Sequence, residues 1–449
     1  MASLASNSST ILITTKDTLL RTTNDLLSSL LTTTTTTGAG EPPKWLLWSI
    51  PSLVLGYPIL VSLLRFRRLR SVHKKYNYPT RESYAKMTDQ DAFEIHRNFS
   101  WLEFPFVVEK ALQFALFRTY GIPSISRLLV QTTEFTTPDN APKRYVDTAT
   151  LIGEFMVHPP SHPRTLDAIS RVNYLHNGYR RGGKILDDDM LYTLSLFAIE
   201  PARWIETYEW RSLSDLEKCA LGTFWKSIGD AMEISYEELP SGKVGFRDGL
   251  HWLEEMTVWS RGYEARNMVP AKTNRQTADE TVNVLLWMVP GFMRPLGLSF
   301  VSYMMDERLR EAMMYDPPSR LSSALFSTLF SLRKFYLRHL ALPRPYFRRY
   351  RFLTETPDKN GRGYTIAWDA APYYVKPTLM NRWGPGALLT WLMGRPVPGD
   401  EGEKYYPGGY VIEDVGPKRF EGKGREELGR TRERLEGERR GQCPFAFGG

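Results

Sequence analysis

Residues 141–157 read APKRYVDTATLIGEFMV, residues 164–180 read RTLDAISRVNYLHNGYR, and the turn between them, HPPSHP, is rich in proline. In both stretches apolar residues recur three and four positions apart, which is the period of an amphipathic α-helix. Proline interrupts a helix because it has no backbone N–H to donate. These stretches therefore predict two antiparallel helices joined by a short turn, and the rest of the fold extends outward from this pair.

Past residue 90 the same helical period dominates, without a series of alternating strands bounded by turns. We therefore predict a mainly α protein with a single large helical domain. Ser214 and Glu217 form a capping box, and Pro163 and Pro201 are expected to start or stop helices. The predicted helices are 104–120, 123–132, 141–157, 164–180, 186–199, 214–231, 246–266, 274–289, 300–315 and 319–341.

The composition excludes several classes of protein. Of the 449 residues, 42% are hydrophobic and 13% aromatic, which is too apolar for general disorder and sufficient for a large core. Only Cys219 and Cys443 are present, so neither a disulfide framework nor a four-cysteine zinc site is expected. Much of the net charge of +8 lies beside an apolar segment or among aromatics and prolines. This distribution favours a lipid bilayer as partner and no nucleic acid.

Residues 45–64 carry no charged side chain. A helix of this length spans the roughly 30 Å hydrocarbon layer of a bilayer, and Trp45 and Trp48 lie where interfacial aromatics occur. The positive-inside rule therefore predicts a single-pass protein with a lumenal N-terminus and a cytosolic C-terminal bulk. A buried core helix or a cleaved signal peptide fits this segment less well. The basic residues that follow the segment are Arg65, Arg67, Arg68, Arg70, Lys74 and Lys75.

Residues 285–305 are also very apolar, but Arg294 lies near their centre. A central arginine costs about 2.5–3.5 kcal/mol on insertion scales, so we predict a core or membrane-skimming element and no second span. Asn7 lies in a glycosylation sequon. The predicted organisation is a disordered Ser/Thr-rich lumenal head (1–44), a transmembrane helix (45–64), a basic juxtamembrane linker (65–90), a helical catalytic domain (91–342), an irregular covering segment (343–398) and a polar tail (399–449).

Three side chains of the helix pair form a candidate site. Arg144 and Thr148 are four residues apart and share a helix face, and His176 ends an apolar stripe on the next helix. If these two helix faces meet, they place an imidazole, a guanidinium and a hydroxyl in one apolar cavity, as a haem site requires. The alternative is structural, because a lone histidine on an apolar face is more often a core residue, and an Arg–Thr pair is more often solvated.

A family resemblance favours the haem site. The run RVNYLHNGY at residues 171–179, with DDMLYTLSLF at 188–197 and EPARW at 200–204, resembles the fungal membrane-bound oxygenases typified by the side-chain-cleaving enzyme of the mycophenolic-acid pathway. Their catalytic domain is similar to that of bacterial latex-clearing protein, a rubber oxygenase. Arg144-Tyr-Val-Asp-Thr148 matches the Arg-x-x-x-Thr element of that enzyme, and the resemblance covers about residues 90–340.

The resemblance implies a fold of the rubber-oxygenase type and a b-type haem whose iron is bound by His176. It implies that Arg144 and Thr148 line the haem pocket and act in catalysis. The implied reaction is oxygen-dependent cleavage of a carbon–carbon double bond in a prenylated, membrane-borne substrate. The implied setting is the endoplasmic reticulum membrane and secondary-metabolite biosynthesis.

Two other functions remain open at this stage. The first is a non-catalytic, membrane-anchored helical protein that binds lipid or acts as a scaffold. The second is an oxidoreductase with another cofactor, although no Gly-rich phosphate loop follows a strand. The remaining conspicuous residues favour structural roles, namely His158 and His162 separated by prolines, the acidic helix start Asp187–Asp189, the ion-pair candidates Glu200, Arg203 and Glu209, and Cys443 in the polar tail.

Overall fold

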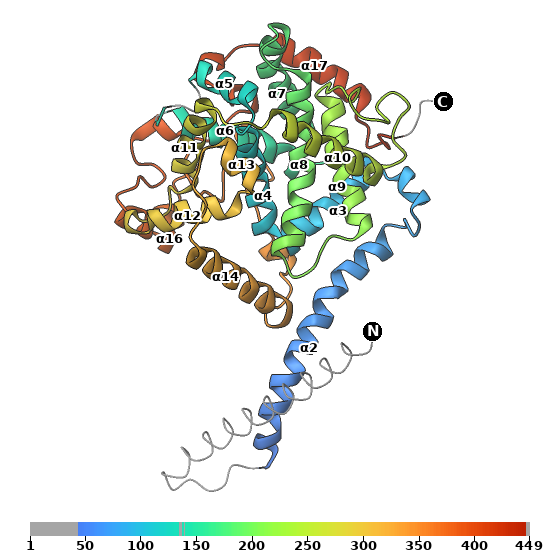
Figure 1. Cartoon of the computed structure of the whole chain (residues 1–449), viewed down its shortest axis with the longest axis vertical. Helices are drawn as coiled ribbons and strands as arrows, with labels where there is room; N and C mark the ends of the chain where they lie inside the picture. The colour runs from blue at the N-terminus through green and yellow to red at the C-terminus, as the bar shows by residue number, and fades with distance from the viewer. Residues whose placement is uncertain (1–43, 134–136, 139, 446–449) are drawn as a thin grey trace, which may run out of the picture. The chain divides into compact units, whose positions relative to one another are not determined.

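The computed structural model describes residues 44–133, 137–138 and 140–445. The chain divides into two compact units, Met1–Leu60 and Val61–Gly449, and the fold described below is that of the second unit. The described residues form helices and three isolated β-bridges, and no strand occurs among them (Figure 1). The prediction of a mainly α protein with one large domain is confirmed. Almost all of the predicted lumenal head, including Asn7, lies outside the described residues.

Most predicted helices are present with small shifts at their ends. The predicted helix 300–315 is two helices, because Asp306 accepts a hydrogen bond from the backbone N–H of Leu309 and starts a new one. The helices are α2 (Lys44–Lys75), α3 (Asp89–Asn98), α4 (Pro105–Thr119), α5 (Pro123–Thr132), α6 (Asn140–Val157), α7 (Pro163–Arg181), α8 (Asp187–Tyr208), α9 (Asp215–Ala231), α10 (Gly249–Asn267), α11 (Lys272–Leu285), α12 (Arg294–Met304), α13 (Glu307–Ala312), α14 (Arg320–His339), α15 (Leu379–Trp383), α16 (Pro385–Leu392) and α17 (Arg425–Glu438).

The prediction that Pro201 ends or starts a helix is wrong. It lies inside α8, which continues to Tyr208. Proline in a helix interior costs about 3 kcal/mol because a backbone hydrogen bond is lost. Tertiary contacts after Pro201 offset this cost: the Trp204 ring packs 5.2 Å from the Phe114 ring of α4, and Ile205 is fully buried. The expected capping box of Ser214 and Glu217 is present at the start of α9.

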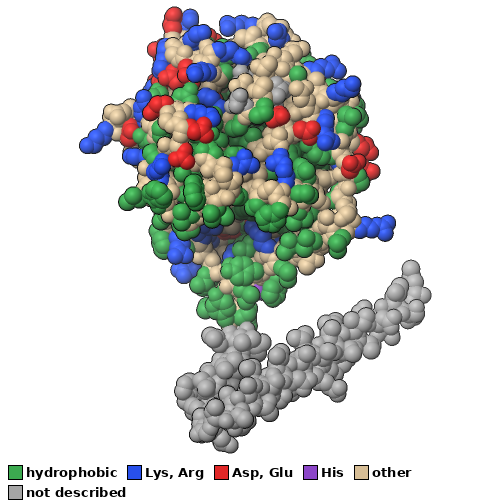
Figure 2. Space-filling view, turned by 90° about the vertical axis from the view of Figure 1, so that its left-hand side faces the viewer, with side chains coloured by type: hydrophobic (Ala, Val, Ile, Leu, Met, Phe, Trp, Pro, Cys, Tyr) green, Lys and Arg blue, Asp and Glu red, His purple; other side chains and the backbone are tan. Residues whose placement is uncertain are grey.

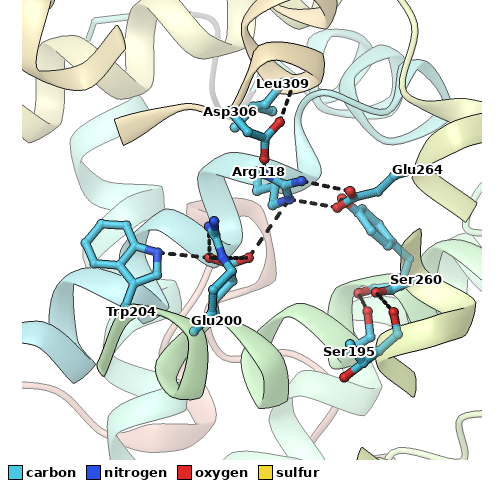
Figure 3. Close-up of polar contacts among 11 residues, drawn as sticks. Arg118, Ser195, Glu200, Trp204, Ser260, Glu264, Asp306 and Leu309 are labelled. Atoms are coloured by element: carbon cyan, nitrogen blue, oxygen red, sulfur yellow. Dashed lines mark hydrogen bonds and ion pairs between the residues drawn. The ribbon is translucent and has the colours of Figure 1, made fainter. Parts of the chain in front are cut away.

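Helix α8 is the centre of the domain, and α4, α9, α10 and α14 pack against it. A buried ionic network joins three of these helices (Figure 3). Arg118 of α4 donates two hydrogen bonds of 2.7 Å to Glu264 of α10, and its guanidinium also pairs with Asp306. Glu200 of α8 lies 4.0 Å from Arg118. Burial alone would lower the pKa of Arg118, but the hydrogen bonds and charge of Glu264 raise it well above its usual value.

The basic linker and the polar tail differ from expectation. Helix α2 continues through the first part of the predicted linker and ends at Lys75. Residues 399–445 pack against the domain, with buried apolar side chains such as Tyr410 and Val415. For residues 421–441 we expected a solvated tail or a short helix, and this stretch contains the short helix α17, which lies on α7. The sequence did not predict these contacts, because the segment is mostly polar and only a few of its apolar residues reach the core.

Within the part of the chain that the structure describes, no helix is both long enough and apolar enough to serve as a membrane span.

Replacing Arg118 with Met is expected to lower the free energy of unfolding by about 3–5 kcal/mol, because Glu264 and Glu200 would lose their buried cation. Urea denaturation followed by tryptophan fluorescence measures this change. Arg430→Met is the matched control, because its pair with Glu426 is exposed and should contribute at most about 1 kcal/mol. Equal, small losses in the two variants would contradict a stabilising role for the network.

Candidate active site

The structure brings Arg144, Thr148 and His176 to the wall of one cavity, which we call the histidine cavity. It lies between α4, α6, α7 and α8 and has two lobes that share these three residues. The space in the larger lobe is about 1060 Å³ and that in the smaller lobe about 810 Å³, and both values include space that is open to solvent. The other shared wall residues are Leu116, Leu175, Met190 and Thr193.

His176 has the chemistry of a neutral metal ligand. Its Nδ1 atom is buried and has no hydrogen-bond partner among the described residues. Burial, together with the positive charges of Arg144 and Arg180, lowers the pKa of His176 to about 4. The imidazole is therefore neutral at physiological pH and keeps a lone pair for a ligand. A buried polar atom without a partner costs about 1–3 kcal/mol, which a bound group in the cavity would reduce.

Arg144 and Thr148 form one unit on α6. The guanidinium donates from Nη1 to the Thr148 hydroxyl at 2.6 Å, and that hydroxyl donates to the Arg144 carbonyl at 2.9 Å. The hydroxyl thus holds the guanidinium at the cavity wall and has its own proton engaged. A cation fixed beside an apolar cavity can pair with a carboxylate or with negative charge that develops during a reaction.

The opposite side of α6 borders a second cavity, which we call the α4–α6 cavity. It encloses about 1010 Å³ counted out to solvent, and its walls are mainly apolar and aromatic. Leu116 borders both cavities, and Ile152 borders both the second cavity and the smaller histidine lobe. The polar residues Glu109 and Asp369 lie in its wall, and burial raises the pKa of Glu109. The two cavities are therefore neighbours across α6.

The C-terminal part of the site was not predicted from the sequence. Pro417, Arg419 and Phe420, from the segment expected to be a tail, line the larger lobe of the histidine cavity. Arg171 of α7 fixes this segment, because its buried guanidinium donates to the carbonyls of Val415 at 2.8 Å and Phe420 at 3.1 Å. The available signal was an arginine among the apolar positions of a core helix, which needs buried acceptors.

The turn between α6 and α7 is held by a second buried carboxylate, Glu154. It accepts hydrogen bonds from Arg164, one of them at 2.9 Å, and from the Tyr410 hydroxyl. Although burial would raise its pKa, hydrogen bonds from His158 and Arg164 lower it. These contacts fix the angle at which α7 presents His176 to α6.

Other candidate residues have structural partners. His158 and His162 stack with ring centroids 4.5 Å apart, and no cluster of three or more metal-binding side chains occurs within the described ranges. Asp189 accepts a 2.6 Å hydrogen bond from Tyr263 at the start of α8. Glu200 pairs with Arg203 as expected, whereas Glu209 pairs with Arg333 of α14. The Cys443 thiol donates to the Ala85 carbonyl at 3.1 Å.

Known proteins resemble the chain over most of its length. It is 54% identical over 402 residues to "ER-bound oxygenase mpaB'" of Penicillium brevicompactum, which covers 90% of this chain and 95% of the relative. It is 48% identical over 375 residues to "ER-bound oxygenase mpaB" of the same species, covering 84% and 89%. It is 54% identical over 273 residues to "ER-bound oxygenase mpaB" of Penicillium roqueforti, covering 61% and 91%. No family model matches the chain.

His176 is expected to make the free energy of unfolding depend on pH between about 6.5 and about 4. The unfolded chain binds the proton more readily because its histidine pKa is the higher one, so stability present above the unfolded pKa is lost as the pH falls through this window. Urea denaturation at several pH values, without added cofactor, compares the wild type with His176→Leu. Below about pH 6.5 the free energy of unfolding of the wild type should fall relative to that of His176→Leu. A difference independent of pH contradicts the burial of a neutral imidazole.

Proposed function

The chain belongs to the family of fungal ER-bound oxygenases and is thus an oxidoreductase of secondary-metabolite biosynthesis, and we propose that it is a membrane-bound, haem-dependent oxygenase that cleaves a carbon–carbon double bond. The family expected from the sequence is confirmed. The non-catalytic lipid-binding or scaffold alternative is disfavoured, because the relatives are named as oxygenases.

One observation carries the proposed haem dependence: a neutral imidazole with an unpartnered buried nitrogen borders the same cavity as a fixed guanidinium. These residues fit a b-type haem, for which His176 would be the iron ligand and Arg144 with Thr148 the pocket residues. When bound, the haem supplies an iron centre that activates molecular oxygen for attack on an alkene. Arg144 would pair with a propionate or with negative charge that develops in the reaction.

The proposed reaction breaks one carbon–carbon double bond and consumes one molecule of oxygen. Each of the two carbons receives one oxygen atom, so the products are two carbonyl compounds and no further reductant is needed. The chain's own contribution is to orient the alkene and exclude water, which the apolar walls of the histidine and α4–α6 cavities favour. A prenyl or lipid-like side chain matches such walls because it is long, apolar and unsaturated.

The proposed location is the endoplasmic reticulum membrane, with the N-terminus lumenal and the catalytic domain cytosolic. Two observations support it, namely the uncharged segment 45–64 with its basic flank and the names of the relatives. A prenylated substrate concentrates in the bilayer, so a membrane-attached enzyme meets it at a high local concentration.

The absorption spectrum of the detergent-purified full chain tests the haem. We expect a Soret band in the wild type and its loss in His176→Ala, with partial recovery on adding imidazole. His96→Phe is the matched control, because His96 is also buried without a hydrogen bond to its ring nitrogens but stacks on Phe224 at 4.6 Å in the core. A colourless, folded wild type, or a band that persists in His176→Ala, contradicts the assignment.

Arg144→Gln is expected to lower kcat by roughly 10² to 10³-fold, because the fixed cation would no longer stabilise developing charge. The assay follows carbonyl products by mass spectrometry after incubation of a prenylated phenol in vesicles under ¹⁸O₂. Arg181→Gln, an exposed arginine at the end of α7, should leave the rate unchanged. Equal rates for the two variants would remove Arg144 from the mechanism, and products without ¹⁸O would exclude cleavage by molecular oxygen.

A further inference from the structure

Exposed large apolar side chains are concentrated in three segments. They are 281–305, 317–354 and 370–399, and none of the three contains an Asp or a Glu. The exposed fraction reaches 86% for Phe292 and 82% for Leu321. We call this surface the apolar face; it consists of Phe292, Met293, Leu296, Leu298, Leu321, Leu325, Leu329, Leu332, Phe335, Tyr336, Leu342, Tyr346, Phe347, Leu379, Met380, Trp383, Leu388, Leu389, Trp391 and Leu392.

Helix α14 shows that this exposure follows a helical pattern. Leu321, Leu325, Leu329, Leu332 and Tyr336 recur at spacings of three and four, so they form one stripe along the helix. All five are exposed, whereas Phe326 of the same helix is buried. An amphipathic helix normally turns its apolar stripe toward the core, so α14 has a second apolar side facing away from the core.

The three segments are contiguous in space. Phe300 of α12 and Phe326 of α14 pack with ring centroids 5.0 Å apart, and Thr390 of α16 contacts Met288 just before α12 at 3.8 Å. Figure 2 shows hydrophobic side chains gathered over the lower end of the domain, with Lys and Arg among them. Large contiguous apolar surfaces on a folded protein mark contacts with another protein or a membrane, so a surface spread over three segments points to a partner.

The second half of α2 joins this face. Ser62, Arg65 and Arg68 each donate a side-chain hydrogen bond to a backbone carbonyl at the end of α14 or just after it, at 3.3, 2.9 and 2.6 Å. Leu63, between them in sequence, is exposed. Residues 62–68 of α2 are therefore fixed to the end of α14, beside the apolar face.

We propose that the apolar face lies in the surface of a bilayer that contains anionic lipid, as a second and direct contact between the domain and the membrane. A bilayer accepts a broad apolar surface without side-chain complementarity, and its anionic headgroups match a border of arginines without acids. The exposed arginines of the acid-free segments and α2 are Arg67, Arg70, Arg320, Arg338, Arg344, Arg348 and Arg351.

A cavity beside the apolar face has wall residues in common with the α4–α6 cavity. Its wall includes Arg294, two residues after Phe292, Arg395, just after α16, and the carboxylate of Glu280. The space, including the part open to solvent, is about 1070 Å³. Ala371 and Tyr373 border both this cavity and the α4–α6 cavity, which in turn shares Leu116 with the histidine cavity. The three cavities are therefore neighbours that share wall residues, from the apolar face to the histidine cavity.

Fluorescent labelling of the full chain in vesicles of phosphatidylcholine and phosphatidylinositol tests this face. In a Cys443→Ser background, a cysteine replaces Leu332 of α14 or Leu392 of α16 and carries an environment-sensitive dye. Val258→Cys on α10 is the control, because Val258 is 72% exposed, close to the 74% of Leu392, and α10 packs on α8 and α9. Lipids with a quencher in the acyl chain should quench the dye severalfold more at Leu332→Cys and Leu392→Cys than at Val258→Cys.

Two outcomes overturn the inference. Equal quenching at all three positions means that the apolar face lies in water, and a blue-shifted but unquenched dye means that protein, such as a second copy of this chain, covers it. The inference rests on the proposed membrane attachment but not on the haem. The Soret band of each labelled protein is therefore recorded in parallel: its absence contradicts the proposed function, whereas equal quenching contradicts the lipid contact alone.

Discussion

The buried guanidinium of Arg118 is the constraint on which the packing depends. A cation that cannot be deprotonated must find acceptors when it is buried, and here they come from α10, α8 and the start of α13 (Figure 3). Its own helix, α4, supplies Leu116 to both cavities, and α8 supplies Met190 to the histidine cavity. The network that aligns the helices thus also sets the distance between the cavity walls.

Helix α6 contacts the candidate site on one side and other parts of the fold on its remaining sides. One side presents Arg144 and Thr148 to His176, a second borders the α4–α6 cavity, and Glu154 ties a third to α7 through Arg164. Each side is satisfied by a partner of matching polarity, so the helix cannot rotate without burying a charge unpaired. Such a rigid wall suits a reaction that requires a fixed geometry around an apolar substrate.

The carboxylates are distributed differently between the interior of the domain and the apolar face. The ionic networks inside the domain use paired carboxylates, whereas the apolar face is formed by segments without Asp or Glu. The cavity beside that face shares wall residues with the α4–α6 cavity. An enzyme whose substrate dissolves in lipid would have its opening at such a border, where apolar and basic side chains meet.

The sequence by itself determined the helical class, most helix positions, the capping box at Ser214 and the helix face that Arg144 shares with Thr148. These depend on interactions between residues three or four apart, which a chain encodes locally. Only the tertiary structure decided that α8 continues through Pro201, that residues 415–423 close over Arg171, and that the apolar stripe of α14 faces outward. Each of these depends on which residues distant in sequence come into contact, and the helical period of a segment does not specify those contacts.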